Sequence, residues 1–286
     1  MKIQFLGATG TVTGSKYLLR CGSKQFLIDC GLFQGFKQLR LRNWGPLPVD
    51  PQTINAVILT HAHIDHSGYL PLLAKNGFKG KIYCTRATRD LCEILLPDSG
   101  HLQEEEAEYA NRQGFSKHKP ALPLYTKEDA GRCLKLFSPL DFDAEWVLDE
   151  ALKVRFIPSG HILGSAFVSI RSPETSILFS GDIGRPNDIV MPAPKTIEAA
   201  DYLVVESTYG DRRHDPADPR LKLAEIINHT AKRGGVVIIP AFAVGRAQTL
   251  LYYIHLLKAE KTIPDLPVFL NSPMAADVTQ LFHNHL

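Results

Sequence analysis

Six consecutive residues combine three imidazoles with a carboxylate: His61-Ala62-His63-Ile64-Asp65-His66. In an extended chain alternate side chains share a face, so His61 and His63 can reach one ion. Asp65 and His66, where the chain turns, would aim at a point beside it. Imidazole nitrogen and carboxylate oxygen suit zinc best, with manganese or iron as substitutes. The spacing therefore predicts two adjacent metal ions.

The elements around this stretch are predicted to hold it at the end of a strand. The run Ala56-Val57-Ile58-Leu59-Thr60 is apolar and β-branched, as in a buried strand, and residues 67–73 indicate a helix start. The metal-binding residues would then lie at a strand-to-helix turn. A chance surface cluster of histidines is the alternative, but it would not require this context.

Three more candidate residues follow apolar strands elsewhere in the chain: Asp29, His161 and Asp182. Strands of one sheet commonly deliver their terminal residues to a shared edge, so these side chains are expected near the histidines. Taken singly, an aspartate after a strand is often only a turn former. A single histidine in a loop usually has no function.

The stretch from His61 to His66 is an HxHxDH motif, and with it the chain resembles the metallo-β-lactamase fold superfamily. Three later stretches narrow the resemblance to the β-CASP nucleases. They are Glu206-Ser207-Thr208-Tyr209-Gly210-Asp211, and residues 240–248 together with Ser272-Pro273-Met274-Ala275. The resemblance implies an α/β fold, with a metallo-β-lactamase αββα sandwich over residues 1–205 and a partial β-CASP domain over 206–286.

The resemblance also implies a role for each candidate. Asp29 and Glu206 would orient the metal ligands by hydrogen bonds. Asp65, Asp182 and Glu206 are the expected catalytic carboxylates, and Arg246 could contact a phosphate or cap its own helix. Glu206 could also be an exposed carboxylate at a strand end. The resemblance also implies two zinc ions, with Asp182 bridging them. Their implied ligands are His61, His63, Asp65, His66, His161 and Asp182.

The second half of the chain alternates strand-like and helix-like segments. Apolar segments at 202–206, 235–241 and 267–270 predict strands, and residues 218–232 and 246–258 predict helices. This βαβ alternation predicts a parallel sheet in a second domain. Earlier in the chain, Pro97-Asp98-Ser99-Gly100 is expected to separate two helices.

Composition excludes several classes of protein. The chain has 286 residues, 44% of them hydrophobic and 22% charged, as in a soluble globular protein. No apolar run approaches the ~20 residues that cross a bilayer, and the N-terminus reads as a strand, so a cytoplasmic protein is expected. Five scattered cysteines without CxxC spacing predict neither disulfides nor a cysteine zinc site.

The family's later elements, among them the final histidine of the second metal's shell, do not occur before Leu286. The chain is therefore expected to stop inside the β-CASP insertion, as a truncated product, a fragment or a degenerate gene. The second metal site would be incomplete and the activity impaired. Strands without neighbours would favour aggregation or a homo-oligomer.

The function that the resemblance implies is zinc-dependent hydrolysis of phosphodiester bonds in RNA, with single-stranded RNA the expected partner and no membrane. Two ions would lower the pKa of water and stabilise charge on the phosphoryl oxygens. A thiolester or lactam hydrolase of the same fold is one alternative, although it would not need the Glu206 block. A non-catalytic binding or partner subunit is the other.

Overall fold

The structure, a computed structural model, describes residues 1–149, 152–197, 199–213 and 215–285. It divides into two compact units. Unit 1 comprises Met1–Pro186 with Ala193–Glu206, and unit 2 comprises Asn187–Pro192 with Ser207–Leu286. Each unit has a hydrophobic core of its own.

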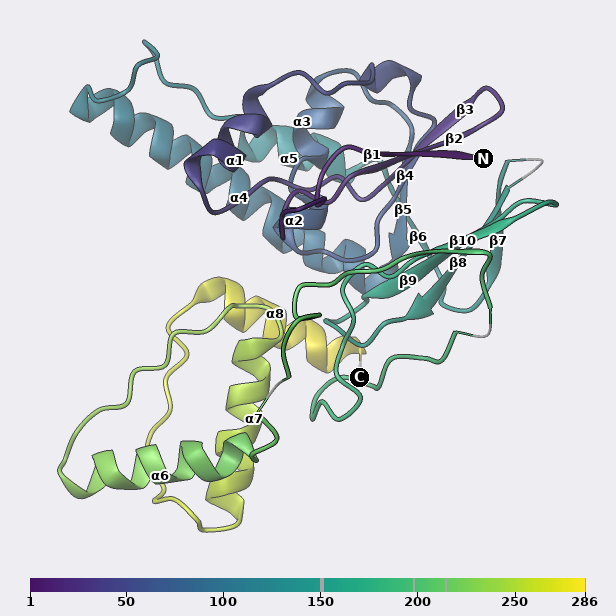
Figure 1. The fold of residues 1–286 in the computed structure, drawn as a ribbon. Helices are drawn as coiled ribbons and strands as arrows, with labels where there is room; N and C mark the ends of the chain where they lie inside the picture. The colour runs from purple at the N-terminus through teal and green to yellow at the C-terminus, as the bar shows by residue number, and fades with distance from the viewer. Residues whose placement is uncertain (150–151, 198, 214, 286) are drawn as a thin grey trace. The chain divides into compact units, whose positions relative to one another are not determined.

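The first sheet of unit 1 has six strands in sequence order (Figure 1). Its first three strands are antiparallel, and the third to the sixth run parallel. The strands are β1 (Lys2–Phe5), β2 (Tyr17–Cys21), β3 (Lys24–Ile28), β4 (Ala56–Ile58), β5 (Lys81–Thr85) and β6 (Phe137–Leu140).

The second sheet of unit 1 has five strands in the order β11-β10-β9-β8-β7. Neighbours are antiparallel except β10 and β11, which are parallel. The strands are β7 (Glu145–Asp149), β8 (Leu152–Pro158), β9 (Ala166–Arg171), β10 (Ser176–Phe179) and β11 (Tyr202–Val204).

The core of unit 1 lies between the two sheets. Phe26, Ile28 and Ile58 from the first sheet join Phe156 and Val168 from the second in one buried cluster. The alternate residues of the first sheet are also buried, among them Leu27 and Val57, both fully inaccessible to solvent. Strands buried on both faces are typical of the parallel part of an α/β sheet, which confirms the predicted fold class.

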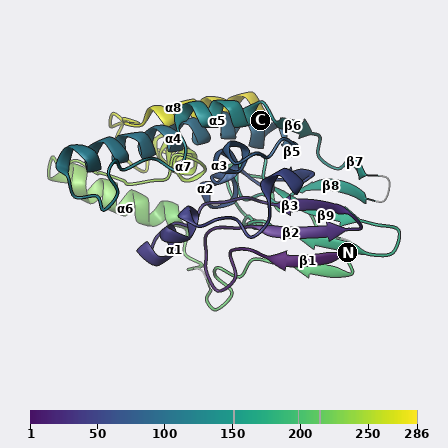
Figure 2. The ribbon, with the colours of Figure 1, turned by 90° about the horizontal axis from the view of Figure 1, so that it is seen from above.

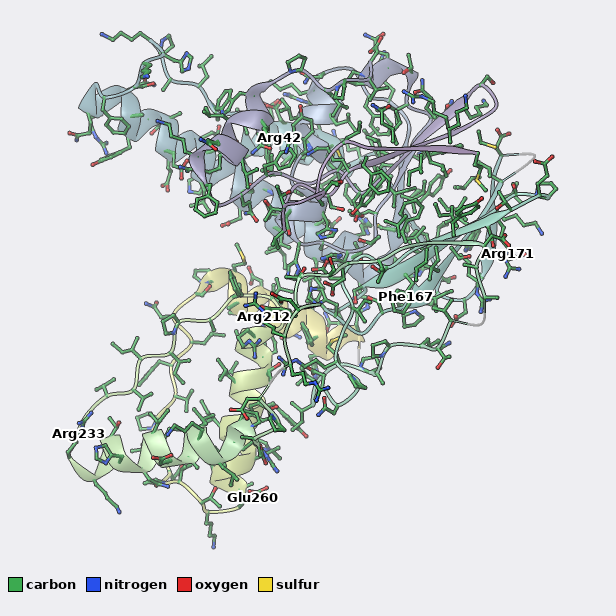
Figure 3. The ribbon with its side chains drawn as sticks, in the orientation of Figure 1. Arg42, Phe167, Arg171, Arg212, Arg233 and Glu260 are labelled. Carbon is green, nitrogen blue, oxygen red and sulfur yellow. The ribbon has the colours of Figure 1, made fainter. Side chains whose placement is uncertain are left out.

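The outer face of the second sheet carries a smaller apolar cluster. Ile157, Phe167 and Leu178 pack there with Ile197, which belongs to the irregular segment before β11. Phe167 lies on β9, which ends at Arg171 (Figure 3). Alternation along β9 thus sends residues to the main core and to this second cluster in turn.

Helices cover the outer face of the first sheet (Figures 1 and 2). In the described part of the chain, none is long and apolar enough to span a membrane. The helices of unit 1 are α1 (Lys37–Leu41), η1 (Arg42–Trp44), η2 (Pro51–Thr53), α2 (Ile64–Ser67), α3 (Leu70–Lys75), α4 (Arg86–Gln113) and α5 (Lys127–Leu134).

Helix α4 continues past Pro97 without interruption, so the predicted break at 97–100 is wrong. A proline inside a helix removes one backbone hydrogen bond. Here the surrounding residues Leu95, Leu96 and Gly100 are buried. A Cβ at Gly100 would lie 2.7 Å from the backbone nitrogen of Lys127, so α4 and α5 pack closely at this point. The packing outweighs the local cost of the proline.

Helix α5 begins with a capping box that also contains an ion pair. The Thr126 hydroxyl accepts from the backbone N–H of Asp129 at 3.1 Å, and the Asp129 carboxylate accepts from that of Thr126 at 3.0 Å. Lys75 and Arg132 also contact this carboxylate, which is only 4% exposed. Burial alone would raise the pKa of Asp129, but these hydrogen bonds outweigh it and lower the pKa to about 2.

Among its described residues, unit 2 contains the helices α6 (Pro219–Lys232), α7 (Arg246–Ala259) and α8 (Pro273–His285). Residues 235–241 and 267–270 form no strand in the described chain, so the predicted parallel sheet of this unit is wrong here. A strand needs a hydrogen-bonded neighbour as well as an apolar sequence. Val236 is 84% exposed, Ile238 85% and Phe269 85%.

Candidate metal centre

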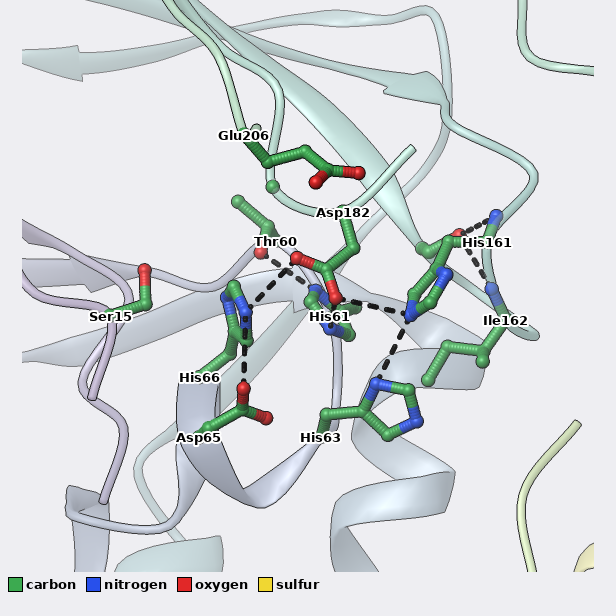
Figure 4. Close-up of polar contacts among 12 residues, drawn as sticks. Ser15, Thr60, His61, His63, Asp65, His66, His161, Ile162, Asp182 and Glu206 are labelled. Carbon is green, nitrogen blue, oxygen red and sulfur yellow. Dashed lines mark hydrogen bonds and ion pairs between the residues drawn. The ribbon is translucent and has the colours of Figure 1, made fainter. Parts of the chain in front are cut away.

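The turn after β4 brings the histidines and the aspartate of the HxHxDH stretch together (Figure 4). Strand β4 is followed by His61 and His63, and α2 then carries Asp65 and His66. The Ser67 hydroxyl shares its single proton between the carbonyl oxygens of Ala62 at 2.8 Å and His63 at 3.1 Å. These two bonds hold the turn tightly closed, so the side chains project to one side.

The second sheet delivers two more side chains to the same place. His161 lies in the loop between β8 and β9, where the Ser165 hydroxyl accepts from its backbone N–H at 2.9 Å. Asp182 follows β10 by way of Gly181, whose φ is +50°. A Cβ on Gly181 would lie 2.7 Å from the Cβ of Thr60, so only glycine permits this approach of the two sheets.

Four side chains form the first group, His61, His63, His161 and Asp182, and each offers one ligand atom within 4.8 Å of the others. Nδ1 of His63 lies 3.2 Å from Nε2 of His161. Oδ2 of Asp182 lies 3.3 Å from Nε2 of His161 and 3.6 Å from Nε2 of His61. Three nitrogens and one oxygen therefore converge on one point.

The other carboxylate oxygen of Asp182 faces a second group. Its Oδ1 lies 3.2 Å from Nε2 of His66, and the same nitrogen is 3.9 Å from Oδ2 of Asp65. Asp182 thus presents one oxygen to each group. All six residues that the sequence singles out as metal ligands meet here.

Asp29 fixes the metal-binding residues through hydrogen bonds, and its side chain is only 1% exposed. Its carboxylate lies 2.7 Å from Nδ1 of His66 and accepts from the backbone N–H of Thr60 at 2.8 Å. It also accepts from the hydroxyls of Thr60 at 2.9 Å and Ser15 at 3.2 Å. Thr60 Oγ1 in turn lies 3.0 Å from Nδ1 of His61. One buried carboxylate therefore fixes two imidazoles.

Sequence reasoning missed Thr60, and also the loop that packs beneath α2. A Cβ on Gly31 would lie 1.6 Å from the carbonyl oxygen of Asp65. Backbone hydrogen bonds join Cys30 N to His66 O at 2.7 Å and Leu32 N to Ile64 O at 3.0 Å. The hydroxyl residue directly before the motif was the available signal for Thr60.

A buried lysine supports the same loop. Lys16 is 2% exposed, and its ammonium donates to the carbonyl oxygen of Gly31. The nitrogen lies 4.7 Å from the ring centroid of Phe33 and 4.6 Å from that of Tyr69. Burial lowers the pKa of Lys16 to about 8.

The remaining candidates, Glu206 and Arg246, lie in different units. The Glu206 carboxylate accepts from the backbone N–H of Ile183, next to Asp182, at 3.3 Å. Its backbone N–H donates to the Ser180 hydroxyl at 3.0 Å. Arg246 is the exposed first residue of α7 in unit 2.

The protonation of the first group suits a cation. Burial lowers the pKa of His61 and His161, and that of His63 to about 3, which favours the neutral form of all three imidazoles. Burial would raise the pKa of Asp182, but the nearby histidines, His61 first, hold it well below its usual range. Neutral imidazoles and ionised carboxylates are the forms that bind metals.

His66 differs from the other histidines, because Asp29 and Asp182 flank it. Burial favours its neutral form, but the two carboxylates outweigh burial and raise its pKa well above the usual value. A metal ion would have to displace the proton on Nε2 of His66.

One buried nitrogen of the site also lacks a hydrogen-bond partner within the part of the chain that the structure describes. Nε2 of His61 is inaccessible to solvent and has no hydrogen bond with the described residues. A buried polar atom without a partner costs about 1–3 kcal/mol. Two more imidazole nitrogens and a carboxylate oxygen surround it, which is a donor set for a divalent metal ion. The cluster is therefore suited to metal binding.

Comparisons with known proteins show which family the chain belongs to. Residues 9–221 match the metallo-β-lactamase superfamily, and residues 247–286 match the β-CASP domain. Ribonuclease TTHA0252 of Thermus thermophilus is 38% identical over 283 residues, which are 99% of this chain and 61% of that protein.

Two further relatives are more distant. Transcription termination factor FttA of Methanocaldococcus jannaschii is 32% identical over 89% of this chain and 39% of its own length. Integrator complex subunit 11 of Danio rerio is 30% identical over 87% of this chain and 41% of its own. The chain spans between 39% and 61% of the length of these relatives. With a metallo-β-lactamase match over most of its length, the chain belongs to the metallo-β-lactamase superfamily, and a match to the β-CASP domain follows at residues 247–286.

Proposed function

We propose that the protein is a zinc-dependent hydrolase that cleaves phosphodiester bonds in single-stranded RNA, in the cytoplasm. The observation that carries the proposal is the placement of Asp182, which offers one oxygen to each of two adjacent ligand groups. Paired cations a few ångströms apart are the usual solution for phosphodiester hydrolysis. The relatives that are named as a ribonuclease and as a transcription termination factor support an RNA substrate.

In this proposal His61, His63, His161 and Asp182 hold one zinc ion, and Asp65, His66 and Asp182 hold the other. The first group supplies three nitrogens and the second only one, so the first ion should bind more tightly. Bound together, the ions would lower the pKa of water and neutralise charge on the phosphoryl oxygens.

The chain's own residues set the tautomers of two of these histidines. Nδ1 of His66 donates to Asp29, and Nδ1 of His61 donates to the Thr60 hydroxyl, which itself donates to Asp29. In its neutral form each ring then has the lone pair of Nε2 on the side that faces Asp182, although His66 must first lose its second proton. Asp29 and Thr60 thereby orient the ligands without touching the substrate.

Glu206 and Arg246 have subsidiary roles in the proposal. Glu206 would fix the backbone beside Asp182 and steady His161, whose pKa its charge raises against the larger lowering by burial. Arg246 would contact a phosphate with its planar guanidinium. We place the boundary between the metallo-β-lactamase and β-CASP domains after residue 205.

The test measures metal and substrate separately. Elemental analysis should find less zinc in purified His63→Ala and Asp182→Ala than in the parent, whereas His101→Ala, at an exposed histidine of α4, should keep it. If both site variants stay folded and keep their zinc, the ligand assignment is wrong.

Zinc-loaded protein is then offered a single-stranded RNA, a thiolester and a β-lactam. Cleavage of the RNA alone is expected. Turnover of the thiolester or the lactam in its place would assign the other enzyme class. Zinc binding without any turnover would favour a binding subunit.

A further inference from the structure

The segment Phe36–Trp44, which forms α1 and η1, is tied directly to the metal-binding loops. The Asn43 side chain, 5% exposed, donates to the carbonyl oxygen of Phe33 at 2.8 Å and accepts from its N–H at 2.9 Å. The neighbouring Leu32 bonds to Ile64, inside the HxHxDH stretch. Figures 1 and 2 both place α1 beside α2. The segment is therefore a fixed neighbour of the metal centre.

Its burial pattern is the reverse of an ordinary surface helix. The polar residue Asn43 is buried, whereas Phe36 is 83% exposed, Trp44 59% and Leu41 57%. Large apolar side chains that gather on a surface commonly mark a binding site. Here two aromatic rings stand at the two ends of one short segment.

The same segment is basic. Lys37, Arg40 and Arg42 are exposed, and residues 30–49 contain no aspartate or glutamate. None of these three cations forms an ion pair with a residue that the structure describes. The guanidinium of Arg42 lies 4.0 Å from the ring centroid of Phe33, which holds it in place (Figure 3). A local charge of +3 thus surrounds the exposed rings.

We propose that Phe36–Trp44 is a binding surface for single-stranded RNA, with bases stacking on Phe36 and Trp44 and phosphates contacting Lys37, Arg40 and Arg42. This inference rests on the proposed function and adds a specific substrate contact to it. Exposed aromatic rings among cations are the pattern by which proteins hold single strands without reading their sequence. A second copy of the chain would bring the same three positive charges against each other, so the charge favours a polyanion.

Binding is measured by fluorescence anisotropy with a labelled 12-nucleotide oligouridine, in chelator so that the probe is not cleaved. Phe36→Ala and Trp44→Ala should each weaken binding by roughly 5–100-fold, as for the loss of one base stack. Trp44→Phe and Phe36→Tyr should restore most of it. Tyr202→Ala removes an aromatic side chain that is 64% exposed on β11, and it should bind as the parent does.

The charge contribution is read from salt dependence. Replacement of Lys37, Arg40 and Arg42 by alanine should make the slope of log Kd against log salt shallower by about 2, since each phosphate contact on a single strand contributes about 0.7. A slope equal to that of the parent would remove the phosphate contacts from the proposal. Thermal melting shows whether each variant is folded.

The outcomes separate this inference from the proposed function. If the parent binds RNA and both alanine variants bind it equally well, the proposed binding surface is wrong, but the proposed function is unaffected. If the variants lose binding but the zinc-loaded parent cleaves no RNA, the surface stands and the function is wrong. No binding by the parent defeats both. Sedimentation that shows a parent dimer but monomeric Phe36→Ala, with unchanged RNA binding, would assign the surface to self-association.

Discussion

Asp29→Asn is the sharpest test of how the site is organised, because it changes one buried oxygen to an NH2 group and leaves the shape intact. The carboxylate now accepts from the N–H and hydroxyl of Thr60, from Ser15 and from Nδ1 of His66. An amide can accept at only one of its two terminal atoms. In either orientation its NH2 group would face a donor, the Thr60 N–H or the Nδ1–H of His66.

The easiest relief is a change of tautomer at His66. If Nδ1 of His66 becomes the acceptor, the neutral ring retains its proton on Nε2, which lies 3.2 Å from Asp182, instead of on Nδ1. The lone pair meant for a metal is then blocked. Loss of such an orienting partner weakens metal binding by roughly 10–100-fold, or about 1.4–2.7 kcal/mol. A donor left unpaired in the other orientation would cost unfolding free energy of about 1–3 kcal/mol.

The assay is competition for zinc with a chromophoric chelator at neutral pH, together with nitrogen NMR of the His66 ring. Asp50→Asn is the matched control, since Asp50 accepts one backbone bond, from Gln52 at 3.0 Å, on the surface of the same unit. The control should bind zinc as the parent does. Equal zinc affinity for Asp29→Asn, with the His66 tautomer unchanged, would refute the orienting role of Asp29.

Three further predictions concern stability. Gly31→Ala should destabilise unit 1 by about 3 kcal/mol, because the added methyl group would clash with the Asp65 carbonyl oxygen. Gly131→Ala, where a Cβ on α5 meets open space, is the control and should stabilise the unit by about 0.5–1 kcal/mol. Thermal melting measures both changes. Asp129→Asn should lower the unfolding free energy by about 2 kcal/mol at pH 7, and the difference should vanish in urea titrations as the pH falls from about 4 to 2, since the folded pKa of about 2 lies below the ordinary value of 3.8. The unfolding free energy of the parent should rise by about 3 kcal/mol between pH 8 and 10.5, because the unfolded lysine still holds a proton that the folded one has lost. Lys16→Met should not show this rise. A difference between parent and variant that does not change with pH would contradict the lowered pKa of Lys16.

Much of the site could be predicted from sequence because its residues follow strands. His61, His161 and Asp182 come after β4, β8 and β10, and strand ends share an edge of the sandwich. The periodicity of apolar residues was enough to find those strands. The partners of Asp29 were not visible, because its bond to the Thr60 hydroxyl spans 31 residues without any repeating pattern.

The incorrect predictions share one cause: the sequence of a segment does not show which distant segments will pack against it. Pro97 is tolerated because α4 and α5 pack together, and nothing in residues 97–100 announces α5. Residues 235–241 and 267–270 have strand-forming sequences but no paired strand in the described chain. Nothing in the sequence around Lys16 indicates the two aromatic rings near its ammonium, because Phe33 and Tyr69 come from other segments.

The division of the ligands between two sheets gives the ion a role in assembly. The turn after β4 supplies His61, His63, Asp65 and His66, while His161 and Asp182 come from the other layer. A bound ion would add a cross-link between two layers that also meet through apolar side chains and through hydrogen bonds, such as that from the Ala166 N–H to the Thr60 carbonyl oxygen at 3.0 Å. Free metal at about a thousand times Kd would stabilise the docked form by about 4 kcal/mol. Neither layer alone holds all the ligand atoms. Metal uptake would therefore show that the two layers have packed correctly, and a misassembled chain would not bind the ion.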